Sequence, residues 1–293
     1  MGNMAKIFDV HVPVKRLNPV PFEFLEGPVW DDVRQTLFFS DPLAQTIVAM
    51  TTEGVFHTIC TNTGYVNGMC LNKANNLVVC KMETGSLEEI NPDTGETVGT
   101  ISFGFGGKPF NATNDVVCNA AGGYYVTDPV FTFGPKTQSC EATYYVTPEG
   151  QTVQVATDSL KPNGLALSPC QTKLYIDDTL STKVWCYTIE RHGLLTNPTV
   201  FCDILPPKNP ADLPPVQRFG EADGLKVDSL GNVYVATFTG IQVFDPAGIW
   251  QGCIPMPGDE TAANMAFGGA DKKTLYVTAR TSLYGARLLV SGI

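Results

Sequence analysis

The sequence predicts an all-β fold, a six-bladed β-propeller, and three observations support this prediction. A short apolar segment that begins with a side-chain oxygen occurs six times along the 293 residues. Each one is followed by further segments rich in β-branched and aromatic residues and bounded by Gly, Pro, Asn and Asp. No sustained helical periodicity interrupts them. Repeats of about 40 to 50 residues are typical of propeller blades, so we expect one domain over residues 1–293.

The residues that open the six segments are called the anchors here. They are Glu26, Asn67, Asn114, Asn163, Asp223 and Asn264. Successive anchors are separated by 41, 47, 49, 60 and 41 residues. Because the first strand of each blade lines the central channel of a propeller, we expect the anchors to ring one mouth of that channel. A ring of carboxylate and amide oxygens is suited to a hard cation such as Ca²⁺.

The remaining strands of each blade are expected to follow its anchor in order. The predicted second strands are residues 36–42, 76–82, 123–129, 173–179, 232–238 and 274–280. The predicted third strands are residues 46–52, 86–92, 142–148, 183–189, 240–246 and 282–288. Outer fourth strands should follow, for example at 97–103 and 152–158. Ring closure needs a terminal strand to complete a blade from the other end, and the two candidates are residues 20–25 and 286–292.

Composition argues against several classes of partner. The net charge is −10 and no run of Lys or Arg occurs, which argues against nucleic acid and anionic membrane surfaces. The sequence has neither an apolar stretch of transmembrane length nor the apolar core of a signal peptide. The nine cysteines are scattered without a CxxC pair, which favours reduced thiols. We therefore expect a cytoplasmic monomer that acts on a small molecule. The three histidines, His11, His57 and His192, lie outside the anchors.

Several motifs, in register, resemble one family. They are EGPVW (26–30), ND (114–115), KPNGLALSP (161–169), EADGLKVDSLGNVYVAT (221–237) and FGGADKKTLYVTA (267–279). Together they resemble the SMP-30/gluconolactonase/luciferin-regenerating-enzyme-like family from about residue 22 to residue 288. The resemblance implies a six-bladed propeller that holds a divalent metal, usually calcium, at the channel mouth. It also implies hydrolysis of sugar lactones, whereas related propellers hydrolyse organophosphates.

The resemblance assigns roles to four anchors. The family's metal-binding Glu, Asn and Asp correspond to Glu26, Asn163 and Asp223, and its ND asparagine, which binds the metal or its water and substrate, corresponds to Asn114. Asp223 is also the expected proton acceptor, and so the catalytic residue. Mg²⁺ or Mn²⁺ could use the same oxygens, whereas Zn²⁺ is less suited because none of the four is His or Cys.

One departure from the family concerns the substrate. Many sugar lactonases carry an Arg two residues before the ND asparagine, where this sequence has Ala112. The absence of this arginine side chain favours a more apolar ligand than a sugar lactone. The possible presence near the site of three aromatic residues points the same way: Phe131, Phe133 and Phe238. Ala112, Phe131 and Phe238 are therefore candidate substrate-binding residues, and so are the anchors Asn67, Asn114 and Asn264.

Two other features have expected structural roles near the mouth. Asp41 and Asp128 end predicted second strands and are expected to cap turns. The Pro-rich residues 203–221 precede Asp223 and are expected to form a lid or a wall at the mouth.

Three functional hypotheses remain open at this point. The first is a metal-dependent hydrolase of a lactone or related ester, in which the metal polarises the carbonyl and Asp223 takes a proton from water. The second is a propeller-fold cyclase or condensing enzyme acting on an apolar small molecule, which the loss of Arg at 112 permits. The third is a noncatalytic calcium-binding propeller. Replacement of Asp223 by Asn separates the first from the third.

Overall fold

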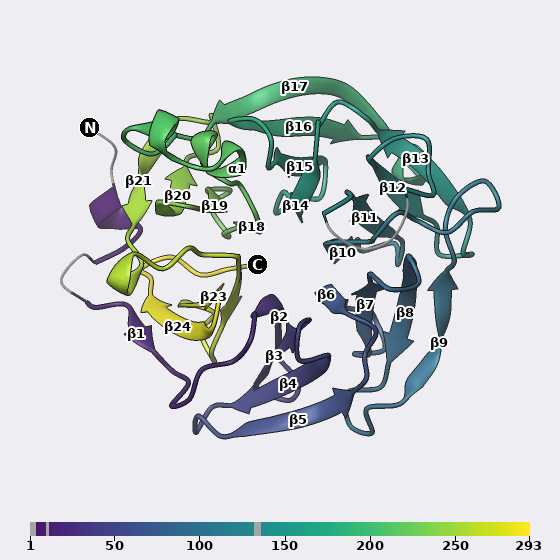
Figure 1. Ribbon diagram of the computed structural model, residues 1–293, viewed down its shortest axis with the longest axis horizontal. Helices are drawn as coiled ribbons and strands as arrows, with labels where there is room; N and C mark the ends of the chain where they lie inside the picture. The colour runs from purple at the N-terminus through teal and green to yellow at the C-terminus, as the bar shows by residue number, and fades with distance from the viewer. Residues whose placement is uncertain (1–3, 10–11, 132–135) are drawn as a thin grey trace.

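Six four-stranded antiparallel sheets surround a central channel, which confirms the predicted six-bladed β-propeller (Figure 1). The computed structural model describes residues 4–9, 12–131 and 136–293. The chain runs outward through each sheet in turn, and only the last sheet takes a strand from the N-terminal segment. The innermost strands of neighbouring sheets contact one another around the channel.

The strands match the predicted order closely. Sheet 1 holds β2 (Glu26–Asp31), β3 (Thr36–Asp41), β4 (Thr46–Thr51) and β5 (Phe56–Thr61). Sheet 2 holds β6 (Val66–Leu71), β7 (Leu77–Lys81), β8 (Ser86–Ile90) and β9 (Thr97–Ser102). Sheet 3 holds β10 (Val116–Cys118), β11 (Tyr124–Asp128), β12 (Ala142–Val146) and β13 (Thr152–Ala156). Sheet 4 holds β14 (Pro162–Leu167), β15 (Lys173–Asp178), β16 (Lys183–Ile189) and β17 (Leu195–Asp203). Sheet 5 holds β18 (Leu225–Val227), β19 (Val233–Thr237), β20 (Gly240–Phe244) and β21 (Trp250–Ile254). Sheet 6 holds β22 (Asn264–Gly268), β23 (Thr274–Ala279), β24 (Ser282–Arg287) and β1 (Lys15–Arg16).

Ring closure uses a segment that the sequence did not single out. The outer strand of sheet 6 is β1, which pairs with β24 through Lys15↔Gly285 and Arg16↔Tyr284. Neither 20–25 nor 286–292 forms this strand. Residues 20–25 instead run along the end of sheet 6, where Phe22 and Leu25 donate backbone hydrogen bonds to Thr281 and Arg280. Pro19 and Pro21 lack the N–H groups that a longer ladder would need, and this is consistent with the early end of the closing strand.

The hydrophobic core is divided among the interfaces between neighbouring sheets. Each of six buried clusters joins two adjacent sheets, and the cluster between sheets 5 and 6 also includes Ile7 and Phe8 from the N-terminal segment. The largest buried aromatic residues, such as Tyr144 and Tyr234, belong to these clusters. The apolar side chains of these clusters pack between the blades. The polar anchors therefore line the mouth of the channel.

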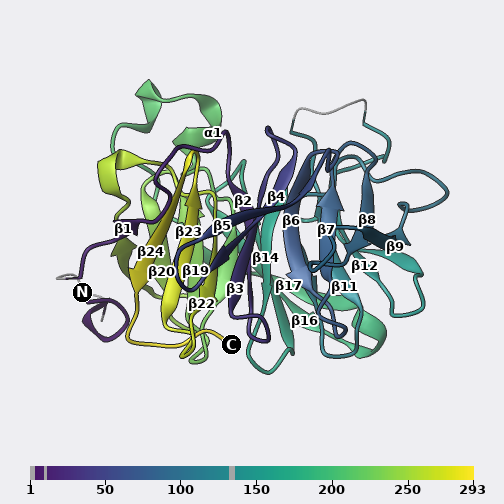
Figure 2. The ribbon, with the colours of Figure 1, turned by 90° about the horizontal axis from the view of Figure 1, so that it is seen from below.

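Helices are short and lie outside the sheets. The only α-helix among the described residues, α1 (Pro215–Arg218), and the 3-10 helix η3 (Pro210–Asp212) belong to the segment that connects β17 to β18. The other 3-10 helices are η1 (Met4–Lys6), η2 (Arg191–Gly193) and η4 (Pro257–Asp259). Figure 2 shows the β17–β18 segment standing above one face of the disc. Within the described part of the chain, no helix is long and apolar enough to cross a membrane.

Candidate metal centre at the channel mouth

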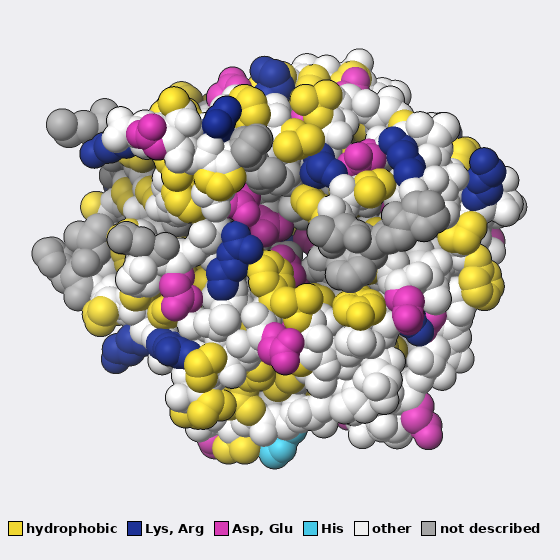
Figure 3. Space-filling view, in the orientation of Figure 1, with side chains coloured by type: hydrophobic (Ala, Val, Ile, Leu, Met, Phe, Trp, Pro, Cys, Tyr) yellow, Lys and Arg dark blue, Asp and Glu magenta, His cyan; other side chains and the backbone are white. Residues whose placement is uncertain are grey.

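The six anchors lie at the entrance to the innermost strands, as predicted. Glu26 and Asn264 are the first residues of β2 and β22, Asn67 and Asn163 are the second residues of β6 and β14, and Asn114 and Asp223 come just before β10 and β18. Five of them are buried in the ring and Asp223 is partly exposed. In the space-filling view, acidic side chains occupy the floor of the central hollow on this face (Figure 3).

A local break in the sheet presents the anchors to the channel. In sheets 1, 2 and 4 the register with the second strand shifts across the anchor and the glycine that follows it, between Glu26 and Val29, Val66 and Met69, and Pro162 and Leu165. Such an irregularity unpairs residues from the ladder and re-aims their side chains. These anchor–glycine pairs lie where neighbouring inner strands meet.

Glycine is required at these positions because the neighbouring strand is too close for a side chain. A Cβ atom on Gly164 would lie 2.2 Å from the carbonyl oxygen of Asp223, and one on Gly68 would lie 2.5 Å from that of Asn114. The short distance allows direct hydrogen bonds between blades: Gly164 donates to the Asp223 carbonyl at 2.9 Å and Gly68 donates to the Asn114 carbonyl at 2.7 Å. One anchor is thereby fixed relative to the next.

Carboxylates at the ends of second strands hold the loops that lead into three anchors. Asp41 accepts hydrogen bonds from the N–H groups of residues 23 and 24, Asp128 from those of 111 and 112, and Asp178 from those of 160 and 161. Each pair of donors stands three and two residues before its anchor. Asp41 also accepts from the N–H of Ala44 in the turn after β3, so the prediction that it caps a turn is confirmed, whereas Asp128 binds the loop before Asn114. Burial raises the pKa of Asp128 to about 7, and the two backbone donors oppose that rise.

Asn163 and Asp223 are directly linked. The Nδ2 atom of Asn163 donates to Asp223 Oδ1 at 2.8 Å and to Thr179 Oγ1 at 3.0 Å. With both acceptors on the nitrogen side, the amide oxygen of Asn163 is left for a ligand. Thr179 in turn donates to the carbonyl oxygen of Ala222 at 2.7 Å, which fixes the backbone just before Asp223.

Glu26 is the second carboxylate of the ring, and its charge is incompletely compensated. Its Oε2 atom accepts from the N–H of Gly27 at 3.0 Å and from Asn264 Nδ2 at 3.4 Å. Burial raises the pKa of Glu26 to about 7, and the nearby negative charge of Asp115 adds to the rise. Burial also raises the pKa of Asp223 well above its usual range. The negative charges of Glu26, Asp177 and Glu221 raise it further.

The remaining predicted site residues that the structure describes each have contacts of their own. Asn114 is held through its backbone, which donates to Thr127 and accepts from Gly68. The side-chain nitrogen of Asn67 lies 3.9 Å from Met82 Sδ. Ala112 is buried, and its N–H is bound to Asp128. Phe131 is half-exposed with Lys161 Nζ 4.8 Å above its ring, Phe238 is half-buried, and Phe133 lies outside the described residues.

Two charged channel residues were missed at the sequence level. Asp115 is buried, and its Oδ2 atom lies 3.4 Å from Asn264 Nδ2 and 3.7 Å from Lys226 Nζ. Lys226 also donates to Asn264 Oδ1 at 3.3 Å. Both residues stand in quoted motifs, ND (114–115) and EADGLKVDSLGNVYVAT (221–237), where they were given no role. The channel thus contains an internal cation next to its acidic residues.

The donor set fits a hard divalent cation. Within residues 4–9, 12–131 and 136–293, no three His, Cys, Asp or Glu side chains are grouped to hold a metal, so a cation here would need amide oxygens as well. Glu26 and Asp223 supply two negative charges, and the charge of Glu26 adds to the rise in the pKa of Asp223, a repulsion that a bound cation would relieve. Asn114 and Asn163 supply neutral oxygens, and the set is all-oxygen, which Ca²⁺ prefers.

The segment at 203–221 forms a wall on one side of the mouth. It leaves β17 after Asp203, and Figure 1 shows it over sheet 5 rather than across the channel. Gln242 anchors its beginning by accepting from the N–H of Leu205 and donating to its carbonyl, both at 2.8 Å. Its end is fixed where Phe238 donates to the carbonyl of Gly220 at 2.8 Å.

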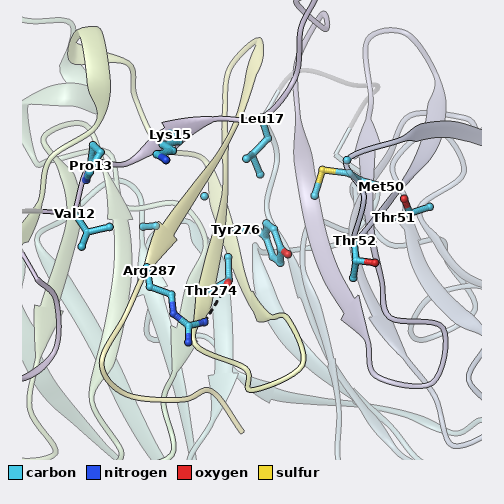
Figure 4. A pocket seen from close by; sticks show the side chains of 13 residues that line it. Val12, Pro13, Lys15, Leu17, Met50, Thr51, Thr52, Thr274, Tyr276 and Arg287 are labelled. Carbon is cyan, nitrogen blue, oxygen red and sulfur yellow. Dashed lines mark hydrogen bonds between the residues drawn. The ribbon is translucent and has the colours of Figure 1, made fainter.

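A separate cavity of about 340 Å³ lies away from this site. It is an open pocket between the N-terminal closing segment and sheets 1 and 6, with Lys15, Leu17, Met50, Tyr276 and Arg287 in its lining (Figure 4). None of the six anchors borders it. Of the histidines in the described chain, His57 is exposed on β5 and His192 is exposed in η2, and His11 lies outside the described residues. All nine cysteines are free.

The fold and the ring of oxygen donors define a class of protein, a six-bladed propeller with a candidate cation site at the mouth of its channel. Residues 24–281 match the model of the SMP-30/Gluconolactonase/LRE-like region, and the chain belongs to this family. The resemblance noted from the motifs is therefore confirmed.

Three similar proteins illustrate the relationship. A gluconolactonase of Zymomonas mobilis is 26% identical over 307 residues, covering 98% of this chain and 84% of that protein. The crystal structure of a putative gluconolactonase superposes with a TM-score of 0.87 at 27% identity, covering 99% of this chain and 97% of the other. A calcium-binding protein, regucalcin, from Agrobacterium tumefaciens has a TM-score of 0.78 at 18% identity, with 96% of each chain covered, and shows the shared fold.

Proposed function

We propose that this protein is a divalent-metal-dependent hydrolase of a small-molecule lactone. The observation that carries the proposal is the convergence of two carboxylates, Glu26 and Asp223, with Asn114 and Asn163 at one channel mouth. The similarity to a gluconolactonase across nearly the whole chain supports the same reaction class. The calcium-binding relative with the same fold supports Ca²⁺ as the first cation to test.

Each residue has a distinct part in this account. Glu26, Asn114, Asn163 and Asp223 would hold the cation, which when bound supplies Lewis-acid polarisation of the lactone carbonyl. Asp223 accepts a proton from the attacking water as the water oxygen bonds to the carbonyl carbon. The ring C–O bond then breaks, and the departing oxygen takes up the proton from Asp223, giving a hydroxy acid. Asn163 keeps Asp223 in position through the 2.8 Å hydrogen bond.

Replacement of Asp223 by Asn tests the assignment. The introduced amide retains an oxygen that can accept from Asn163 Nδ2 but is not a base at neutral pH. We expect kcat for δ-gluconolactone to fall at least about 100-fold, in line with a lost general base. The thermal midpoint should not fall, because burial disfavours the carboxylate charge that the substitution removes.

Asp245→Asn is the matched control. Asp245 lies in the turn that follows β20 of the same sheet, and its carboxylate binds backbone N–H groups of that turn. Its substitution should leave kcat within about twofold, since surface changes away from a site have small effects. Full activity in Asp223→Asn would remove the general-base assignment.

A further inference from the structure

Arg280 places a guanidinium at the rim of the channel mouth. It follows β23 directly, in the turn that leads to β24, at the same end of the sheet as Asn264. Its carbonyl oxygen accepts from the N–H of Leu25 at 2.7 Å, so its backbone is bound to the residue next to Glu26. Its side chain is 41% exposed. Figure 3 shows Lys or Arg side chains next to the central hollow on this face.

Glu221 holds this guanidinium from the side of Asp223. Arg280 Nη2 donates to Glu221 Oε1 at 2.9 Å, and Glu221 stands two residues before Asp223. The Glu221 backbone has φ of 50°, a left-handed conformation that is unfavourable for a non-glycine residue. Its second oxygen, Oε2, is enclosed and has no hydrogen-bond partner among the described residues. The Arg280–Glu221 pair therefore includes one carboxylate oxygen, Glu221 Oε2, that accepts no hydrogen bond from the described residues.

Phe24 supports the guanidinium from the side of Glu26. The Cζ atom of Arg280 lies 5.4 Å from the ring centroid of Phe24, in the range of a cation–π contact. Phe24 stands two residues before Glu26, and its N–H is held by Asp41 at 3.1 Å. Arg280 is thus fixed between two segments, each of which leads into one carboxylate of the candidate metal centre.

Lys161 is a further cation near the mouth, and other protein groups occupy more of its hydrogen-bond donors. It stands two residues before Asn163, and its side chain is 13% exposed. Its ammonium donates to the carbonyl of Val130 and to Glu141 Oε2. Arg280 by contrast makes one hydrogen bond through its side chain within the described part of the protein, out of five N–H groups. The guanidinium has donors to offer a ligand.

We propose that Arg280 and Glu221 form a polar clamp that binds the hydroxyl groups of a polyhydroxylated lactone and orients its ring carbonyl toward the metal centre. The inference rests on the proposed lactone hydrolysis. Glu221 balances the charge of Arg280, so the pair suits a neutral ligand more than an anion. A hydroxyl group can accept from the spare N–H donors of Arg280, while Glu221 holds the guanidinium in place. A site of this kind discriminates against an analogue without hydroxyls.

The test compares two lactones on Arg280→Met. Met retains an unbranched chain that can pack on Phe24 but removes every N–H donor. The probes are δ-gluconolactone and δ-valerolactone, which share a six-membered lactone ring and differ in ring hydroxyls and the hydroxymethyl group. After subtraction of the uncatalysed rate, the selectivity is the ratio of the two kcat/KM values. We expect this ratio to fall about tenfold or more, the loss of a charge-assisted hydrogen bond.

Arg287→Met is the matched control. Arg287 is also an arginine of sheet 6 paired with a carboxylate, that of Asp271, but it lies at the end of β24 far along the strand from Arg280. Its substitution should leave the selectivity within about twofold of the wild type. Thermal unfolding of both variants shows whether either change acts through folding.

The outcomes separate the inference from the proposed function. A tenfold fall in selectivity for Arg280→Met, with Arg287→Met unchanged, supports the clamp. Equal loss on both lactones, or no change on either, overturns the clamp while wild-type turnover keeps the proposed function. If the wild type hydrolyses neither lactone, the proposed function fails and the clamp fails with it.

Discussion

Asn163 donates from its side-chain nitrogen to Asp223 Oδ1 at 2.8 Å, across 60 residues of sequence and between neighbouring blades. This bond ties two predicted metal ligands together and decides which atom of Asn163 faces a ligand. Thr179 supports the arrangement, because its hydroxyl accepts from the same nitrogen and donates to the backbone before Asp223.

Thr179→Val should therefore weaken both the fold and the site. Valine has a similar shape but leaves the buried carbonyl of Ala222 without a donor and Asn163 with one fewer acceptor. We expect a loss of roughly 1–3 kcal/mol of unfolding free energy and a weaker Ca²⁺ affinity, measured by urea unfolding and calorimetry. Thr199→Val, on the exposed edge strand β17, should change unfolding by less than about 0.5 kcal/mol. Equal effects of the two substitutions would contradict the role of Thr179.

Gly164→Ala tests the close approach of the inner strands. The added Cβ would meet backbone atoms of Asp223 and Leu225, at 2.2 Å and 2.6 Å, so the strands must separate. We expect a destabilisation of roughly 1–3 kcal/mol or more by urea unfolding, typical of overpacking. Gly99→Ala is the control, because β9 is an outer strand and nothing lies within 4 Å of its added Cβ. Wild-type stability of Gly164→Ala would show that the strand spacing is adjustable.

Lys226 and Asp115 should be energetically coupled. Their 3.7 Å ion pair is inside the channel, with side-chain exposures of 27% and 4%. A double-mutant cycle with Lys226→Met and Asp115→Asn should give a coupling of roughly 1–3 kcal/mol, because removal of the ammonium leaves a buried carboxylate without its cation. The exposed pair Lys183–Asp203 should give less than about 1 kcal/mol. A coupling no larger than that of the exposed pair would show that solvent in the channel screens the interaction between Lys226 and Asp115.

Cys170 should be the most reactive thiol. It is exposed, and hydrogen bonds with Thr172 and then Ser168 lower its pKa to about 7, whereas burial raises the pKa of Cys118. A lowered pKa means that the thiolate forms as pH rises through about 7, so alkylation by iodoacetamide should accelerate between about pH 6 and pH 8. Peptide mass spectrometry should find Cys170 labelled first. Faster labelling of Cys118 would contradict the predicted order.

The sequence allowed the architecture and the anchors to be predicted because both depend on local pattern. Each anchor precedes its own apolar strand, and each second strand, such as β15 or β19, carries its β-branched and aromatic residues within a few positions. Repetition of that pattern six times is enough to define the blades, and the family motifs then assign roles to particular oxygens.

Contacts between distant blades could not be predicted in the same way. Lys226 appears as a strand residue until the structure brings it to Asp115 and Asn264. The sequence-level search for a cationic donor at the mouth ended at Ala112, whereas the structure places Arg280 there through contacts with Glu221 and Phe24. The closing strand was missed because β1 has only two residues, too few for a recognisable pattern.

The most direct test of the central claim is the dependence of lactone hydrolysis on free Ca²⁺. The protein would be stripped with EDTA, and δ-gluconolactone turnover would be followed as Ca²⁺ is added, with Glu26→Gln beside the wild type. We predict that stripped wild type is inactive, that Ca²⁺ restores turnover with saturation, and that Glu26→Gln needs at least about tenfold more Ca²⁺, since one of two ligand charges is gone. Full turnover by the stripped protein, unchanged on adding Ca²⁺, would contradict the claim that these anchors form a metal-dependent active site.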